Sequence, residues 1–398
     1  MNAPFAGSFS GPTLELPAQL KRGLQAGHPW VYRDHIPRGF QAANGSWVKV
    51  RAGGYTAFAL WDESSKIALR MFSERGVPDA DWVKERVAAA LELRRTLIGD
   101  QTSAYRLLYG EGDGIPGLTV DIYGSFAAIV TYADSLETVV PWVVRALVEL
   151  LKPHGIVRRA RVRDGEPPRL EVLHGRLPPR DLIISEHGLR MQVDLFLGQK
   201  TGLFLDHREN RRMLGDLCAG KRVLNLFSYT GAFSLYAARA GATSVTSVDM
   251  SQPAARAART NFELNGFDPE QHEFLSEDVF EFLERTRQAG ITYDVVICDP
   301  PSFANSRDQQ KNALRAYVSV NSSGLRVLAP SGIYAAASCT AQVSGEAFRG
   351  VLAESAVNAK RRLQIFHDAA HAPDHPIFVG HPEGRYLKFL VARALPIP

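Results

Sequence analysis

Apolar positions in the second half of the chain fall into short runs separated by helix-like segments. Five of these runs predict strands, at residues 223–227, 244–249, 272–276, 293–299 and 332–338. Regular alternation of strand and helix from about residue 189 onward is typical of a doubly wound α/β sheet. We therefore expect ligands at the edge where the carboxyl ends of the strands meet.

Two other patterns precede this region. Residues 11–75 combine glycines and aromatic residues with short β-like runs at 46–50 and 55–60, which predicts a small β-barrel. Apolar residues three and four apart over 81–97 then predict a helix that opens a segment of strands around one further helix. We expect three domains: a β-barrel at 11–75, a central α+β module at 80–188 and an α/β domain at 189–398.

Composition narrows the class of protein. The chain has 398 residues, of which 45% are hydrophobic and 22% are charged, as is typical of soluble globular proteins. Its apolar runs stay well short of the roughly 18 residues that span a bilayer, and the N-terminus does not resemble a secretory signal. We expect a cytoplasmic protein without a membrane partner. Three cysteines without metal-ligand spacing predict neither a metal site nor a disulfide.

The most informative motif is the strand, turn and helix at 221–240. Gly231 lets the backbone of the turn approach a ligand closely, and Asp249 ends the next strand, 18 positions later. An acid near this spacing commonly accepts hydrogen bonds from ribose hydroxyls. The turn lacks the G-x-G-x-x-G pattern of dinucleotide sites, so a cofactor with ribose and adenine but no phosphate fits better. That indicates S-adenosylmethionine (SAM); the alternative is an ordinary turn with a solvated Asp249.

Further motifs make the chain similar to a known family. Five of them lie in the second half of the chain, at residues 198–211, 225–234, 299–303, 338–339 and 381–388. Two more lie near the N-terminus, at 20–36, and in the central module, at 110–119. Together they resemble the bacterial 23S rRNA (cytosine-5) methyltransferases of the RlmI type. The resemblance implies a PUA-like N-terminal domain, a central α+β module and a C-terminal Rossmann-like class I methyltransferase domain. It implies RNA, namely 23S rRNA, as partner, and leaves a homodimer open.

The resemblance also implies a cofactor site for SAM. It places Asp249 on the ribose, Asp278 opposite the adenine amino group, and Asp206 and Arg208 near the amino-acid end. A structural ion pair is an equal alternative for Arg208. The residues implied around the methionine part are Asn225, Phe227, Ser228, Thr230 and Gly231.

Cytosine-5 methylation requires activation of the base, because carbon-5 of the intact ring is not nucleophilic. A thiolate that adds to carbon-6 provides that activation, and Cys339 follows a predicted strand at the same edge as Asp299. Asp299 would pair with the N3 and N4 edge of the base. Pro300 and Pro301 would form a stiff platform for a flipped base, with Phe303 near it. The alternative for Cys339 is a small buried hydrophobe.

Basic residues suggest how RNA is held. Lys21 and Arg22, in the predicted barrel, are candidate phosphate contacts, and Trp30 and Tyr32 either stack on bases or belong to the barrel core. Arginines at 158, 159, 161 and 163 form either a solvated edge strand or a second phosphate-contacting face. Two rival functions remain. One is methylation of a base nitrogen, such as guanine N7, on the same fold, and the other is RNA binding without catalysis.

Overall fold

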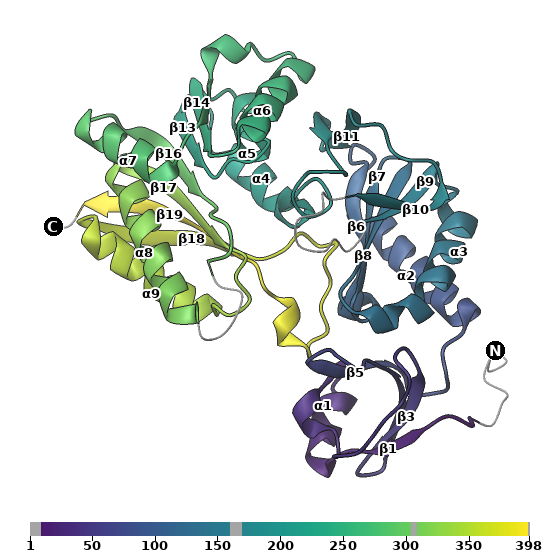
Figure 1. Cartoon of the computed structure of the whole chain (residues 1–398). Coiled ribbons are helices and arrows are strands. Elements are labelled where there is room, and N and C mark those ends of the chain that lie inside the picture. The colour runs from purple at the N-terminus through teal and green to yellow at the C-terminus, as the bar shows by residue number, and fades with distance from the viewer. Residues whose placement is uncertain (1–8, 160–168, 304–308, 397–398) are drawn as a thin grey trace. The chain divides into compact units, whose positions relative to one another are not determined.

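The computed structural model describes residues 9–159, 169–303 and 309–396, and the chain divides into two compact units (Figure 1). The first unit comprises residues 1–184, 193–205 and 373–384. The second comprises residues 185–192, 206–372 and 385–398. The three-domain division expected from the sequence stays a prediction, with its first two domains falling almost wholly within the first unit.

The first sheet of unit one alternates buried and more exposed side chains. Val48, Val50 and Ala52 of β3 (Trp47–Ala52) are buried, which is the period of two expected of a strand. The strand order is β1-β3-β4-β5-β2, with β1 parallel to β3 and the other pairs antiparallel. The remaining elements are β1 (Thr13–Glu15), α1 (Lys21–Gln25), β2 (Trp30–Tyr32), β4 (Tyr55–Trp61) and β5 (Ile67–Ser73).

The second sheet of unit one has the order β10-β9-β8-β7-β6 and packs against two helices. Helix α2 (Ala80–Leu97) buries Val83, Val87 and Leu91, which lie four residues apart and therefore share one face. Helix α3 (Val140–Leu151) links β8 to the parallel strand β9. The strands are β6 (Ala104–Tyr109), β7 (Leu118–Tyr123), β8 (Phe126–Thr131), β9 (Gly155–Arg159) and β10 (Leu170–Gly175).

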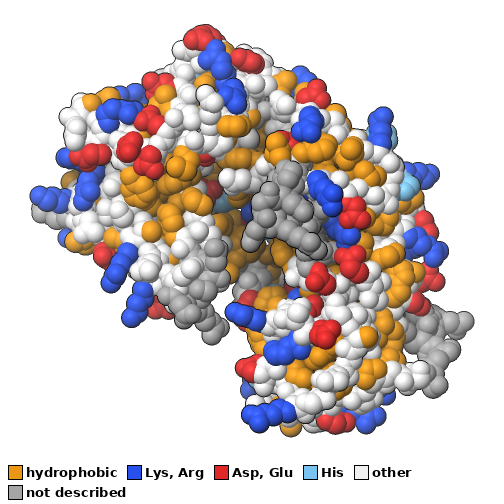
Figure 2. All heavy atoms as spheres, viewed as in Figure 1, with side chains coloured by type: hydrophobic (Ala, Val, Ile, Leu, Met, Phe, Trp, Pro, Cys, Tyr) orange, Lys and Arg blue, Asp and Glu red, His pale blue; other side chains and the backbone are white. Residues whose placement is uncertain are grey.

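The arginine-rich segment is only partly described. Arg158, on β9, forms ion pairs with Glu137 and Glu171, so its charge is neutralised within the protein. Arg161 and Arg163 lie outside the described residues. On the face of the molecule in Figure 2, basic and acidic side chains are interspersed, in keeping with a net charge of +4.

Unit two contains a seven-stranded sheet of order β15-β14-β13-β16-β17-β19-β18. The first five strands in this order are parallel, and β19 is antiparallel to both of its neighbours. The chain runs outward from β13 through β14 to β15, then returns to β16 on the other side of β13. The strands are β13 (Arg222–Leu226), β14 (Ser244–Asp249), β15 (Glu273–Ser276), β16 (Tyr293–Cys298), β17 (Leu328–Ser338), β18 (Arg361–Ala369) and β19 (Lys388–Pro396).

Two sets of helices flank this sheet, with α4, α5 and α6 in one set and α7, α8 and α9 in the other (Figure 1). The second set builds an apolar core with the central strands, in which Val296, Tyr317 and Phe348 are fully buried. The helices are α4 (Arg208–Gly215), α5 (Ala232–Arg239), α6 (Gln252–Leu264), α7 (Val279–Gln288), α8 (Gln310–Arg326) and α9 (Gly345–Asn358). A two-stranded sheet of β11 (Leu182–Glu186) and β12 (Leu189–Val193) lies where the chain passes between units.

The doubly wound α/β arrangement predicted from the sequence is confirmed. All five predicted strands are present, although β17 begins four residues before the predicted start at 332. Strands β18 and β19 were not predicted. β18 is an edge strand on which Ile365 and Phe366 are both exposed, so it lacks the alternation that marks a half-buried strand.

The turn before α5 generates a stability prediction. Gly231 has a φ of 73°, and a Cβ added there would lie 2.8 Å from the Cβ of Ala258. We expect Gly231→Ala to lower the free energy of unfolding by about 2–4 kcal/mol, because left-handed backbone and overpacking both oppose the new methyl group. Gly241→Ala is the matched control, since Gly241 has a φ of 86° and meets no atom of the described residues within 4 Å. It should lose only about 1 kcal/mol in urea denaturation; equal losses would contradict the close contact.

Candidate functional site

The loop between β13 and α5 is held in an uncommon backbone conformation. Phe227, Tyr229 and Gly231 have φ values of 57°, 47° and 73°, and for the two non-glycine residues this costs on the order of 1–3 kcal/mol each. Strand β14 holds the loop in place. The Ser228 N–H donates to the Val248 carbonyl over 3.0 Å, and the Tyr229 N–H donates to the Asp249 carboxylate over 2.9 Å. Strain that neighbouring structure maintains in this way is common at ligand sites.

Asp249 connects two loops at the end of β14. Its Oδ2 accepts the Tyr229 N–H and its Oδ1 accepts the Ser251 N–H, each over 2.9 Å. Each carboxylate oxygen can accept a second hydrogen bond, so the side chain is oriented by the protein and still able to receive two hydroxyl groups. This arrangement suits the ribose-binding role expected of it.

Polar groups lie beneath and within the same loop. The buried Asn225 donates to Ser234 Oγ over 2.9 Å, and Ser234 Oγ lies 2.7 Å from Ser247 Oγ. The Oγ of Ser228 is also buried, but it has no hydrogen-bond partner among the described residues. A buried hydroxyl without a partner is unfavourable. A polar group of a bound cofactor would satisfy it, so the loop fits a ligand of the expected kind.

The carbonyl of Thr230, in the same loop, accepts a hydrogen bond from Asn261 of α6.

Asp278 begins α7 beyond the end of β15. Its Oδ1 accepts the backbone N–H groups of Phe280 and Glu281 over 2.8 and 3.1 Å, as an N-cap does. The structure therefore gives Asp278 a role in starting the helix, and its expected contact with adenine stays a prediction.

Three consecutive buried polar residues lie where α4 begins: Asp206 and His207 precede the helix, and Arg208 is its first residue. The Tyr386 hydroxyl donates to Asp206. Arg208 forms an ion pair with Glu209 over 3.1 Å, which is the structural alternative considered for it. A hydrogen bond from His187, together with Arg208, lowers the pKa of Glu209 to about 2. The cofactor roles of Asp206 and Arg208 stay predictions.

His207 was not singled out by sequence reasoning, although it lies within a motif that carried the resemblance. Its Nε2 lies 3.4 Å from Oδ2 of Asp299, and its ring packs edge-on against both Phe233 and Phe389 at centroid distances of 5.4 and 5.7 Å. The side chain is therefore fixed, and it orients the carboxylate that follows β16. Only the sheet topology brings η5 (Leu205–His207) to this strand end.

The loops after β16 and β17 are joined directly. Because the two strands are parallel, Asp299 and Cys339 lie beyond the same edge of the sheet. Thr340 Oγ1 lies 3.1 Å from Ser302 Oγ and 2.7 Å from the Tyr317 hydroxyl. Burial raises the pKa of Tyr317 to about 12, with smaller contributions from Cys339 and Asp299, so both groups lie within electrostatic range of one phenol.

The three cysteines differ in their surroundings. Cys218 and Cys298 are fully buried, and burial raises the pKa of each thiol to about 12. Cys339 is only partly buried. Of the platform residues, Pro300 is buried and Pro301 is exposed, while the Phe303 ring packs edge-on against Tyr317 at 4.9 Å. Stacking of Phe303 near a flipped base stays a prediction.

Comparisons with known proteins identify the family. The family model for S-adenosylmethionine-dependent methyltransferases matches residues 154–375, and that for a PUA-like domain matches residues 14–74. The chain belongs to the S-adenosylmethionine-dependent methyltransferases. This confirms the predicted cofactor and the predicted fold class.

Relatives and solved structures similar to this methyltransferase cover nearly the whole chain. The ribosomal RNA large subunit methyltransferase I of Shewanella frigidimarina is 36% identical over 96% of this chain and 98% of its own length. The protein of the same name from Aeromonas salmonicida is 37% identical over 94% and 97%. The crystal structure of a methyltransferase complexed with SAH is 26% identical, with a TM-score of 0.86 over 96% of this chain and 100% of that one. The resemblance indicated by the motifs is confirmed.

Lys388, like His207, is a residue of this methyltransferase to which sequence reasoning assigned no role. It begins β19, pairs with Ser338 across the sheet, and donates through Nζ to the carbonyls of Thr340 and Tyr386 over 2.6 and 2.7 Å. Like His207, it lies within a motif that carried the resemblance, at residues 381–388, but nothing in that motif assigned it a role. The antiparallel pairing with β17 decides its position beside Cys339.

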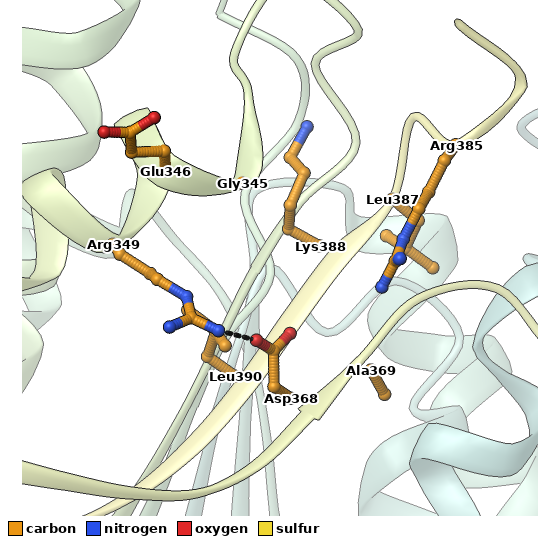
Figure 3. A pocket seen from close by; sticks show the side chains of 9 residues that line it. All are labelled: Gly345, Glu346, Arg349, Asp368, Ala369, Arg385, Leu387, Lys388 and Leu390. Atoms are coloured by element: carbon orange, nitrogen blue, oxygen red, sulfur yellow. Dashed lines mark hydrogen bonds and ion pairs between the residues drawn. The ribbon is translucent and has the colours of Figure 1, made fainter. Parts of the chain in front are cut away.

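Lys388 also lines a cavity of about 470 Å³ between α9, β18 and β19 (Figure 3). Across this cavity Arg349 and Asp368 form an ion pair, while the Lys388 ammonium points away from that pair. The other lining residues are Gly345, Glu346, Ala369, Arg385, Leu387 and Leu390.

Within the described residues, no three His, Cys, Asp or Glu side chains are arranged to hold a metal ion. No helix in the described part of the chain is long and apolar enough to cross a membrane.

The arrangement of Asp249 generates a binding prediction. We expect Asp249→Ala to weaken SAM binding by about 1.5–3 kcal/mol, roughly tenfold or more, because charge-assisted bonds to the ribose are lost and the Tyr229 N–H loses its acceptor. Isothermal titration calorimetry measures the affinity, and thermal unfolding tests that the variant is folded. Wild-type affinity in a folded Asp249→Ala protein would contradict the ribose assignment.

Proposed function

We propose that this methyltransferase methylates carbon-5 of a cytosine in large-subunit (23S) ribosomal RNA, through a covalent bond between Cys339 and carbon-6 of the base. The names of the relatives from Shewanella frigidimarina and Aeromonas salmonicida support the RNA class. The observation that carries the chemistry is the junction of the Asp299 and Cys339 loops, where Ser302 meets Thr340 over 3.1 Å. A cytoplasmic location accords with this substrate, and the homodimer stays an open expectation.

Each residue in this junction has a task in the proposed reaction. The Cys339 thiolate forms a bond to carbon-6 while the π electrons of the C5–C6 bond move to carbon-5, which becomes nucleophilic. SAM, when bound, supplies the methyl group. Loss of the carbon-5 proton then restores the C5–C6 double bond and breaks the sulfur–carbon bond, which returns the thiolate.

In this proposal Asp299 binds the N3 and N4 edge of the base, away from carbon-6, where the thiolate adds. Its carboxylate accepts a hydrogen bond from the N4 amino group and favours a proton on N3, which makes carbon-6 a better acceptor of the thiolate. His207, 3.4 Å from Oδ2, holds the carboxylate in position. Pro300 and Pro301 restrict the backbone that follows Asp299 and so keep the base platform rigid. The base must leave its stack to reach this site.

The thiol generates the test of the mechanism. We expect Cys339→Ser to abolish both methylation and the covalent adduct that wild type forms with RNA containing 5-fluorocytosine, because fluorine cannot leave as a proton does and the adduct persists. SAM affinity should be unchanged. Gel electrophoresis detects the adduct, and mass spectrometry of nucleosides detects the methylated base.

Cys218→Ala is the matched control for this experiment. Cys218 is a buried thiol that donates a hydrogen bond to the Leu214 carbonyl, so the control variant should retain the adduct. Methylated cytosine in the Cys339→Ser product would refute the covalent mechanism. Methylated guanine in place of cytosine would support the nitrogen-methylating rival, and failure of the wild type to bind SAM would support a purely RNA-binding role.

The N-terminal unit is proposed to contribute phosphate contacts. Lys21 and Arg22 lie on α1, and neither forms an ion pair within the described part of the chain. Trp30 is less available for stacking on a base. Its Nε1 donates to Glu111 over 2.8 Å, and its ring packs against His381 at a centroid distance of 4.4 Å. The cations are therefore the better candidates for RNA contacts.

We expect replacement of both Lys21 and Arg22 by Ala to flatten the salt dependence of RNA binding by up to about two units, because each lost phosphate contact removes just under one. Filter binding at several salt concentrations measures the slope. Arg51→Ala is the control, since Arg51 already pairs with Glu15 over 3.5 Å and should change the slope less. An unchanged slope in the double variant would exclude these two residues from the RNA site.

A further inference from the structure

Lys388 is a buried cation without a carboxylate partner. The residue is 9% exposed, and within the described residues it forms no ion pair with any Asp or Glu. Burying an unpaired charge is costly, so such a group is retained only where another interaction compensates for it. The proposed reaction as described above does not use this residue.

The backbone holds Lys388 next to Cys339 in two ways. Lys388 pairs with Ser338, the residue before the cysteine, and its Nζ donates to the carbonyl of Thr340, the residue after it. A second hydrogen bond runs to the Tyr386 carbonyl. An ammonium group carries three N–H bonds, so one remains after these two acceptors are counted. The position of the cation is thus set by the same strand pairing that positions the thiol.

Burial and the neighbouring thiol act in opposite directions on the charge of Lys388. Burial lowers the pKa of Lys388 to about 8, and the charge of a Cys339 thiolate opposes this shift. Such an interaction is mutual: a thiolate that favours the ammonium is itself favoured by it. Tyr317 stays neutral, because burial raises its pKa to about 12.

Further groups surround the two partners. Asp299, with His207 beside it, is an anion that opposes thiolate formation. On the cavity side, Arg385 and the ion pair of Arg349 with Asp368 share the lining with Lys388.

We propose that Lys388 is a positioning residue whose buried ammonium stabilises the thiolate form of Cys339 and so prepares the thiol for attack on carbon-6. The thiol proton passes to solvent when the thiolate forms, and the cation again stabilises the thiolate when the sulfur–carbon bond breaks. This inference rests on the proposed function, because it assigns Cys339 as the nucleophile. It explains how a thiol with an ordinary pKa near 8.5 becomes reactive at neutral pH.

The test follows the reaction of Cys339 with iodoacetamide as a function of pH, in the full-length protein without RNA. Mass spectrometry of the Cys339 peptide measures the rate, and Cys339→Ser gives the background. In the wild type we expect a midpoint below about 8.5, the value of an unperturbed thiol. A wild-type midpoint at or above that value overturns the proposal without any lysine variant.

Substitutions of Lys388 test directly whether its charge lowers the pKa of the Cys339 thiol. In Lys388→Met the midpoint should rise by about one pH unit or more, so that alkylation at pH 7 slows at least about tenfold. Lys388→Arg keeps the charge and should stay closer to wild type than Lys388→Met. Arg385→Met is the matched control, because it removes a neighbouring cation from the same cavity lining and should leave the midpoint unchanged. A wild-type midpoint in Lys388→Met overturns the proposal.

Two internal readouts separate structural damage from loss of the charge. Cys218 and Cys298 are buried, so their alkylation reports unfolding of a variant. Lys388→Gln provides a second neutral variant if the Met variant unfolds. The two proposals fail in different experiments. Methylation by Cys339→Ser would contradict the proposed function, whereas the alkylation profile tests the effect of Lys388 on the thiol whether or not that thiol attacks RNA.

Discussion

Parallel pairing of β13 with β14 on one side and with β16 on the other is the constraint on which both halves of the site depend. Side chains that follow parallel strands emerge at one sheet edge, so the loops after β13 and β14 face the same region as those after β16 and β17. The chain moves outward on one side of β13 and returns on the other. The loops after β14 and β16 therefore lie on either side of the expected cofactor position. Cys339 follows β17, the strand next to β16.

In the proposed cofactor half of the site, a strained backbone is held in one fixed conformation. Positive φ at Phe227 and Tyr229 is unfavourable in isolation, and it is maintained because β14 provides acceptors at Val248 and Asp249. Asp249 thus orients the loop while it keeps the capacity to bind hydroxyl groups. In the proposed role on the ribose, this carboxylate would link cofactor affinity to the conformation of the loop.

The proposed substrate half of the site contains titratable groups that are buried or partly buried. Asp299, Tyr317, Cys339 and Lys388 come from four different parts of unit two. Thr340, the residue after Cys339, lies 2.7 Å from the Tyr317 hydroxyl through Oγ1 and accepts a hydrogen bond from Lys388 at its carbonyl, and Lys388 also donates to the Tyr386 carbonyl. Tyr386 also donates to Asp206, so the segment before α4 joins the same network. Low dielectric surroundings strengthen each of these interactions, which is why the protonation state of one group depends on its neighbours.

The sequence by itself determined the order of the central strands and helices, the turn at Gly231, the carboxylate at the end of β14 and the family. Each of these depends on local spacing or on a contiguous motif, and local patterns survive in a linear sequence. It did not reveal β18, because exposed apolar residues on an edge strand carry no alternation, nor β19, whose run of buried residues shows no period of two. Nor did it assign roles to His207 and Lys388. Their contacts with Asp299 and with the backbone around Cys339 join segments far apart in the chain, and only the pairing of β17 with β19 and the return of η5 to the sheet edge bring those segments together.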